Sequence, residues 1–110
     1  MYTSEGDVLT SVAPEVINAS TELCIETGSI LEAHKLNMRV THSICVVRDN
    51  ENGAFKVLTP CGVCQERLFY WGRNVRVAVT TSGKKLQFRT LEEVQPFHWT
   101  KAYKDNDIFN

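Results

Sequence analysis

The feature that most constrains the fold of this chain is a pair of cysteine motifs, each placed where a helix is predicted to begin. The first motif is Cys24-Ile25-Glu26 and the second is Pro60-Cys61-Gly62-Val63-Cys64. Cys61 and Cys64 lie in the first turn of the second helix, at a spacing that lets both thiols face one point. Helix N-termini carry partial positive charge, which favours thiolates. A fold that uses both motifs brings two helix starts together.

Three thiols that meet in this way suit zinc, which prefers thiolate and imidazole ligands. A catalytic zinc site supplies three protein ligands and leaves one position for water, and here Cys24, Cys61 and Cys64 would be the ligands. Zinc lowers the pKa of that water to about 7. Glu26 does not share a helix face with Cys24, so it need not be a ligand. It can instead take a proton from the water and return it to a leaving nitrogen.

Two other uses of the cysteines remain open. A structural zinc module would need a fourth protein ligand, either Cys45, which is the spare cysteine, or a histidine. A dithiol redox protein would use Cys61 and Cys64 without a metal. Neither alternative explains a glutamate two residues after Cys24. Cys45 lies in an apolar run and is predicted to be a core residue, since a buried free cysteine behaves as a small hydrophobe.

Predicted strands and helices alternate along the chain. Strands are expected in an N-terminal hairpin (1–3 and 7–13, around Glu5-Gly6) and at 40–47, 54–58, 75–81 and 86–90. Helices are expected at 18–35 and at 61–70, and a short helix is expected to begin at 91–94, before a frayed tail at 105–110. This order predicts an α/β fold, a layered sheet with helices packed on it.

The length of 110 residues allows a single domain, residues 1–110. The net charge of −1 argues against a nucleic-acid partner, because binding by phosphate neutralisation needs a basic face. No apolar run approaches the roughly 20 residues that span a bilayer, which argues against a membrane partner. The N-terminus also lacks the layout of a signal peptide. A cytoplasmic location is therefore expected, where cysteines serve more often as metal ligands, redox groups or core residues than as disulfides.

The two motifs together resemble those of the zinc-dependent cytidine deaminase family: a His or Cys ligand, any residue and Glu, followed later by Pro-Cys-x-x-Cys. The resemblance runs from Tyr2 to about Tyr103 and is nearest to small nucleoside deaminases, including blasticidin-S deaminases, which use three cysteines. It implies a mixed five-stranded sheet flanked by helices, zinc on the three cysteines and Glu26 as the proton shuttle. It also implies water attack on C4 of a cytosine nucleoside, release of ammonia, and a homo-oligomer, a tetramer or a dimer.

The sequence departs from the family pattern in three places. Family members carry a helix and a strand before the region that matches residues 2–10, so the resemblance implies a chain short at its N-terminus. The Asn and Glu of the sugar-binding segment have no matching pair here, which leaves Glu15 as the candidate substrate contact. Three-cysteine members carry an Arg after the catalytic Glu, where this chain has Thr27. Arg67, on the helix face of Cys64, is a candidate to offset the thiolate charge instead.

Overall fold

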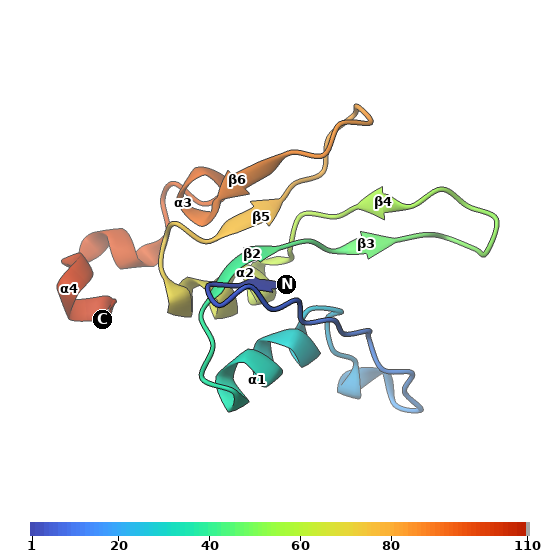
Figure 1. The fold of residues 1–110 in the computed structure, drawn as a ribbon, viewed down its shortest axis with the longest axis horizontal. Coiled ribbons are helices and arrows are strands. Elements are labelled where there is room, and N and C mark those ends of the chain that lie inside the picture. The colour runs from blue at the N-terminus through green and yellow to red at the C-terminus, as the bar shows by residue number, and fades with distance from the viewer. Residues whose placement is uncertain (110) are drawn as a thin grey trace.

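The computed structural model describes residues 1–109 and contains a mixed sheet with helices packed on it (Figure 1). The strands are β1 (Tyr2–Thr3), β2 (Val40–Ser43), β3 (Val46–Val47), β4 (Lys56–Val57), β5 (Arg76–Ala78) and β6 (Phe88–Thr90). The α-helices are α1 (Thr27–Lys35), α2 (Gly62–Leu68), α3 (Leu91–Val94) and α4 (Asp105–Ile108). Single 3-10 turns form η1 (Ala19–Thr21), η2 (Phe69–Trp71) and η3 (Trp99–Ala102).

The main sheet has four strands in the order β1-β2-β5-β6. Strands β2 and β5 are parallel, and the outer pairs β1–β2 and β5–β6 are antiparallel. The predicted α/β class with a mixed sheet is confirmed. The expected single sheet of five strands is not observed, because the main sheet has four strands and β3 and β4 form a separate two-stranded sheet.

The strand predicted at 40–47 is divided into β2 and β3. Before the division, Ser43 pairs with Val77 of β5, whereas after it Val46 pairs with Val57 of β4. At the junction the backbone N–H of Leu58 donates to the carbonyl of Cys45 at 3.0 Å. Because the chain changes hydrogen-bonding partner here, β3 and β4 extend away from the main sheet as an arm (Figure 1).

The predicted N-terminal hairpin is present in its first strand and its turn, but the strand predicted at 7–13 is reduced to one bridge residue, Val8. The chain reverses at Gly6, whose φ of 88° lies in the left-handed region that glycine adopts without strain. Tyr2 then forms an antiparallel bridge with Val8 while β1 pairs with β2. The segment after Val8 therefore runs back across the start of α1, a placement that matters for the site.

The helix predicted at 18–35 is shorter than expected. Asn18 does act as a cap, since its side chain accepts from the N–H of Ser20, but the turn that it caps is only η1. Non-helical residues follow, and α1 begins at Thr27. The second helix agrees with its prediction: Cys61 is the N-cap of α2, and Gly72 ends η2 with a φ of 103°.

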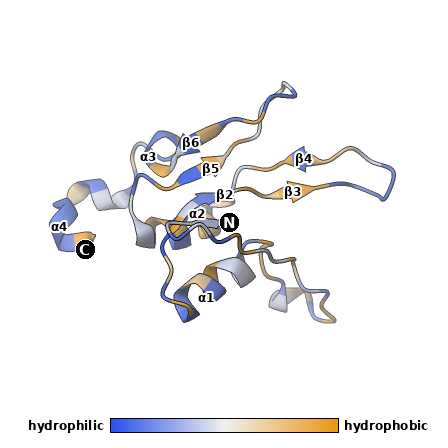
Figure 2. Ribbon diagram, viewed as in Figure 1, coloured by the Kyte–Doolittle hydropathy of each residue, from blue (hydrophilic) through white to orange (hydrophobic). Residues whose placement is uncertain are grey.

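The core lies between the main sheet and the helices α1 and α2. Its buried members come from both helices, the sheet and the start of α3, and include Ile30, Ala33, Val40, Leu68, Val77 and Leu91. Figure 2 shows β3 as hydrophobic and the turn between β3 and β4 as hydrophilic. Among the described residues, no helix combines the length and the apolar composition that crossing a bilayer requires.

The C-terminal tail, predicted to be frayed at 105–110, instead contains α4 over its described part. Arg73 holds this part in place: its guanidinium donates to Thr100 Oγ1 at 2.7 Å and to Asp105 Oδ1 at 2.9 Å. The same guanidinium lies over the ring of Phe109, 5.1 Å from its centroid. Residue 110 lies outside the described residues.

Candidate active site

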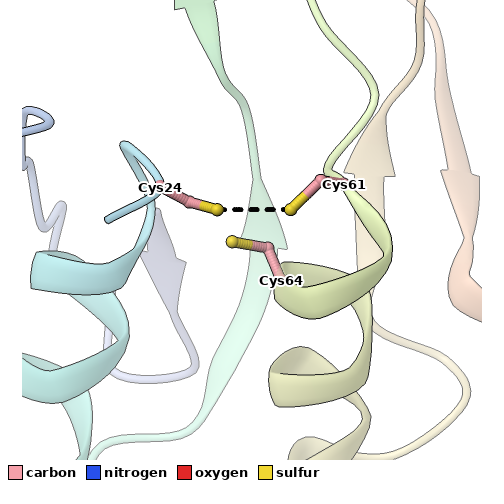
Figure 3. Close-up of side chains that lie close together, drawn as sticks. All are labelled: Cys24, Cys61 and Cys64. Carbon is pink, nitrogen blue, oxygen red and sulfur yellow. Dashed lines mark hydrogen bonds between the residues drawn. The ribbon is translucent and has the colours of Figure 1, made fainter. Parts of the chain in front are cut away.

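The three predicted cysteines meet at one point between α1 and α2 (Figure 3). The sulfurs of Cys24, Cys61 and Cys64 all lie within 4.8 Å of one another, and the Sγ atoms of Cys24 and Cys61 are 3.2 Å apart. In Figure 3 the side chains of Cys24 and Cys61 point toward each other across the gap between the helices, and that of Cys64 points into the same gap. The sequence therefore correctly predicted which cysteines come together.

Each helix start positions its cysteine through the backbone. Cys61 is the extended N-cap residue of α2, and the N–H of Gln65 donates to its carbonyl at 2.9 Å, which closes the first turn. That turn carries Cys64 to the same side as Cys61. Cys24 precedes α1, and its carbonyl accepts the N–H of Thr27 at 3.1 Å. The prediction that Cys24 lies near a helix start is correct, although the residue itself is not helical.

The electrostatics of the cluster differ from thiol to thiol. The backbone N–H of Cys64, at the start of α2, donates to the Cys61 sulfur and lowers the pKa of Cys61. The hydrogen bond with Cys61 raises the pKa of Cys24, as expected where one thiol donates its proton to the other. Burial raises the pKa of Cys64, which is fully buried. Without a metal, the cluster thus concentrates negative charge on Cys61.

The donor set fits a zinc ion. A tetrahedral zinc with Zn–S bonds near 2.3 Å separates its sulfurs by roughly 3.8 Å, a spacing compatible with sulfurs that lie within 4.8 Å of one another. Over residues 1–109, the group has three members, Cys24, Cys61 and Cys64. Three thiols leave one of four tetrahedral positions for another ligand, as in catalytic sites rather than closed structural ones.

Glu26 lies beside this cluster. It is the residue that immediately precedes α1, only 6% of its surface is exposed, and it does not belong to the ligand group. It lines a cavity of about 500 Å³ between the segment after the N-terminal hairpin and the start of β3. We call this space the Glu26 cavity; its walls include Ser11, Val12, Ala13, Ile25, Ile44 and Val46.

The fourth cysteine lies near Glu26. Cys45 is 5% exposed, as predicted for a core residue. Burial, followed by the charge of Glu26 and a hydrogen bond with it, raises the pKa of Cys45 to about 11. No sequence pattern predicts this contact, because Cys45 stands in an apolar run far along the chain from Glu26.

Two further predicted residues lie away from the thiols. Glu15 is exposed, in the irregular segment before η1, and it does not line the Glu26 cavity. Arg67 reaches from α2 to α1, where its Nη1 donates to Thr27 Oγ1 at 3.1 Å. Arg67 thus contacts the residue that follows Glu26, and its role in offsetting thiolate charge stays a prediction.

The chain is similar to two deaminases, although no family model matches it. The structure matches the crystal structure of the cytidine deaminase from Bacillus anthracis with a TM-score of 0.93. Those two chains are 60% identical, over 96% of this chain and 75% of that one. The blasticidin-S deaminase of Bacillus cereus is 25% identical over 103 residues, which make up 90% of this chain and 73% of that relative.

The mixed sheet, the three thiols at two helix starts and these similarities define a deaminase, a hydrolase that acts on C–N bonds. The cytidine deaminase from Bacillus anthracis is 60% identical to this chain and is matched over three quarters of its length, which is enough to assign the family. The chain belongs to the cytidine deaminase family.

Proposed function

We propose that this chain is a zinc-dependent hydrolytic deaminase that converts cytidine, deoxycytidine or a related cytosine nucleoside to the uracil form. The observation that carries the proposal is the convergence of three thiols within 4.8 Å beside a buried glutamate. Cys24, Cys61 and Cys64 would hold the zinc, and Glu26 would be the catalytic residue. The similarity to a cytidine deaminase supports the choice of substrate.

A catalytic site is favoured over a structural zinc module by the number of ligands. A structural site needs a fourth protein ligand, and within the described part of the chain Cys45 is not a member of the thiol group. A dithiol redox role would use Cys61 and Cys64 alone, yet the sulfur of Cys24 lies 3.2 Å from that of Cys61 and within 4.8 Å of that of Cys64. The buried glutamate has a use only in the deaminase.

The chemistry follows from the position of Glu26. Zinc, when bound, lowers the pKa of a coordinated water to about 7. The Glu26 carboxylate takes one proton from the attacking water and passes it to N3 of the ring, and it then carries the remaining proton of the new hydroxyl group to the departing amino nitrogen. The water oxygen stays on C4 of the ring, the C4–N bond breaks, and ammonia leaves. Because Glu26 is buried, bulk water does not compete for these protons.

The Glu26 cavity suits a flat pyrimidine ring. Val12, Ala13, Ile25, Ile44 and Val46 give it apolar walls, and Glu26 supplies an acidic group at one side. Apolar walls with a small number of polar groups are typical of small-molecule sites. Glu15 remains a candidate sugar contact only if the exposed segment that carries it moves toward the cavity.

A blasticidin-S-type nucleoside antibiotic is the second candidate substrate. The similarity to blasticidin-S deaminase favours it, together with the missing Asn and Glu pair of the sugar-binding segment. Both candidates share the cytosine ring, so they require the same chemistry at Glu26. A comparison of kcat/KM for cytidine, deoxycytidine, cytosine and blasticidin S separates them.

Self-association is also part of the proposal. Ile17 and Phe97 are almost completely exposed, at 108% and 96%, which is unusual for apolar side chains without a partner. A tetramer or dimer of this chain would cover such residues. Sedimentation velocity of the purified protein tests this, and a monomer at micromolar concentration would contradict it. Cytoplasmic residence stays a prediction from the sequence.

The catalytic role is tested by replacing Glu26. We expect Glu26→Ala to retain zinc and to lose turnover by about 10²- to 10⁴-fold, the usual contribution of a general acid–base group. Turnover is measured as the loss of absorbance near the cytidine maximum together with ammonia release. Glu32→Ala, an exposed change on the same helix, is the matched control and should keep full activity. Full activity of Glu26→Ala would refute the proton shuttle.

A further inference from the structure

The start of α1 has no cap from its own first residue. Glu26 occupies the N-cap position, yet its side chain makes no capping hydrogen bond. The first backbone N–H groups of a helix have no partner within the helix and need an acceptor from elsewhere. If the Glu26 carboxylate transfers protons, it cannot also accept hydrogen bonds from these N–H groups. Another acceptor must therefore stabilise the first turn of α1.

Ser11 supplies the missing cap from a distant segment. The backbone N–H of Ser29, in the first turn of α1, donates to Ser11 Oγ at 3.0 Å. Ser11 Oγ in turn donates to the carbonyl of Ile25 at 2.7 Å and lies 2.8 Å from Ser29 Oγ. Since the Ser11 proton goes to Ile25, the Ser29 hydroxyl must be the donor in the last contact.

These bonds enclose Glu26 on both sides along the chain. Ile25 precedes it and Ser29 lies one helical turn beyond, so one hydroxyl fixes the backbone before and after the carboxylate. Ser11, Ile25, Glu26 and Ser29 also line the same cavity. The hydroxyl is therefore placed to control where the carboxylate stands relative to a bound ring.

Gly28 makes this approach feasible. A Cβ at Gly28 would lie 2.7 Å from Ser11 Cβ, closer than side-chain carbons come. A glycine inside a helix costs up to about 1 kcal/mol of helix stability. The close contact with Ser11 explains why a glycine stands at this helical position, because any larger residue would push Ser11 away from α1.

We infer that Ser11 is a positioning residue for Glu26, an inference that rests on the proposed deaminase function. Ser11 does not touch the reacting atoms. It holds the turn that carries the carboxylate, and misplacement of a reacting group by about 1 Å can cost roughly 100-fold in rate.

The test compares Ser11→Ala with the wild-type holoenzyme, both loaded with zinc. We expect kcat on the best cytosine nucleoside to fall about 10- to 100-fold, with KM within about threefold and the zinc content unchanged. Ser11→Thr keeps the hydroxyl and should recover most of kcat. Ser82→Ala, an exposed serine deletion in the turn between β5 and β6, controls for loss of a hydroxyl and should leave kcat unchanged.

A second variant covers the case in which Ser11→Ala does not fold. Gly28→Ala keeps the Ser11 hydroxyl but drives the two segments apart, so kcat should fall in the same way. A merely structural role would lower the melting temperature and leave kcat unchanged well below it. An unchanged kcat in Ser11→Ala or in Gly28→Ala, or an equal loss in Ser11→Thr, would overturn the inference. A wild-type protein inactive on all four candidate substrates would instead overturn the proposed function, and the inference with it.

Discussion

Among the four thiols, Cys61 stands in the surroundings that most favour ionisation. It is exposed and its pKa is lowered by the N–H of Cys64, whereas Cys64 and Cys45 are buried with raised pKa values. Alkylation requires an accessible thiolate. We therefore expect iodoacetamide to modify Cys61 first in the metal-free protein at neutral pH, as read by mass spectrometry of peptides.

Bound metal should suppress this reaction, because a thiolate that ligates zinc is no longer free to attack. Protein reloaded with zinc before alkylation is the control and should keep all three ligands unmodified. Modification of Cys64 as fast as Cys61 would contradict the electrostatic description of the cluster.

At this scale the spacing within two short motifs correctly predicted that Cys24, Cys61 and Cys64 meet, whereas the catalytic role of Glu26 stays a prediction. It did not identify Ser11 or the closeness of Cys45 to Glu26. Ser11 and Ser29 are 18 residues apart, and their contact exists only once the N-terminal hairpin has turned the chain back over α1. An isolated serine or a cysteine in an apolar run belongs to no motif, so the sequence does not predict the contacts of Ser11 with Ser29 or of Cys45 with Glu26.

At the scale of elements, α3 begins with a complete capping box. The backbone N–H of Thr90 donates to Glu93 Oε1 at 3.0 Å, and the N–H of Glu93 donates to Thr90 Oγ1 at 3.1 Å. The bond from the Thr90 backbone is the largest influence that lowers the pKa of Glu93 below its ordinary value of 4.5. The folded state therefore favours the ionised form of this side chain.

The sign of the resulting pH dependence follows from the lowered pKa. The charge of Glu93 contributes stability above pH 4.5, and that contribution is lost as the pH falls through the folded pKa. In Glu93→Gln the side chain still accepts the Thr90 N–H but does not ionise. We expect the wild type to melt at a higher temperature than Glu93→Gln near neutral pH, and this difference to disappear once the pH falls below the folded pKa of Glu93. A difference that persists there would contradict this.

Two of the elements that differ from their predictions, the strand at 40–47 and the first long helix, do so for tertiary reasons. Val40 to Val47 reads as one strand, but the chain changes partner from β5 to β4 at Cys45, which no local pattern encodes. The polar cap Asn18 correctly marks a turn, yet the helix begins only at Thr27, where Ser11 accepts the backbone N–H of Ser29 in the first turn. Capping residues and hydrophobic periodicity predicted where the helices lie, but tertiary contacts determine the residues at which they begin and end.

At the scale of the whole molecule, the C-terminal segment depends on Arg73. We expect Arg73→Met to free α4, since one guanidinium bonds Thr100 and Asp105 and covers Phe109. Hydrogen exchange should accelerate for the amides of η3 and α4 and stay unchanged for those of β2. Arg89→Met removes an exposed arginine from β6 and is the control. Equal protection of η3 and α4 in both variants would contradict the role of Arg73.

The alternation of strands and helices was enough to predict the fold class, because a chain that alternates in this way builds a sheet covered by helices. The division into a four-stranded sheet and a separate arm was not predictable, since both halves of residues 40–47 are rich in β-branched residues. The tail was expected to fray, and the buried guanidinium of Arg73 holds its described part in place instead.

The most direct measurement is X-ray absorption at the zinc edge of the purified, zinc-loaded protein. We expect three sulfur neighbours at about 2.3 Å and one nitrogen or oxygen neighbour, because three thiols converge and a fourth position stays open for water. The Glu26→Ala variant should give the same spectrum, since Glu26 is not a ligand. Four sulfur neighbours, or fewer than three, would contradict a catalytic centre built on Cys24, Cys61 and Cys64.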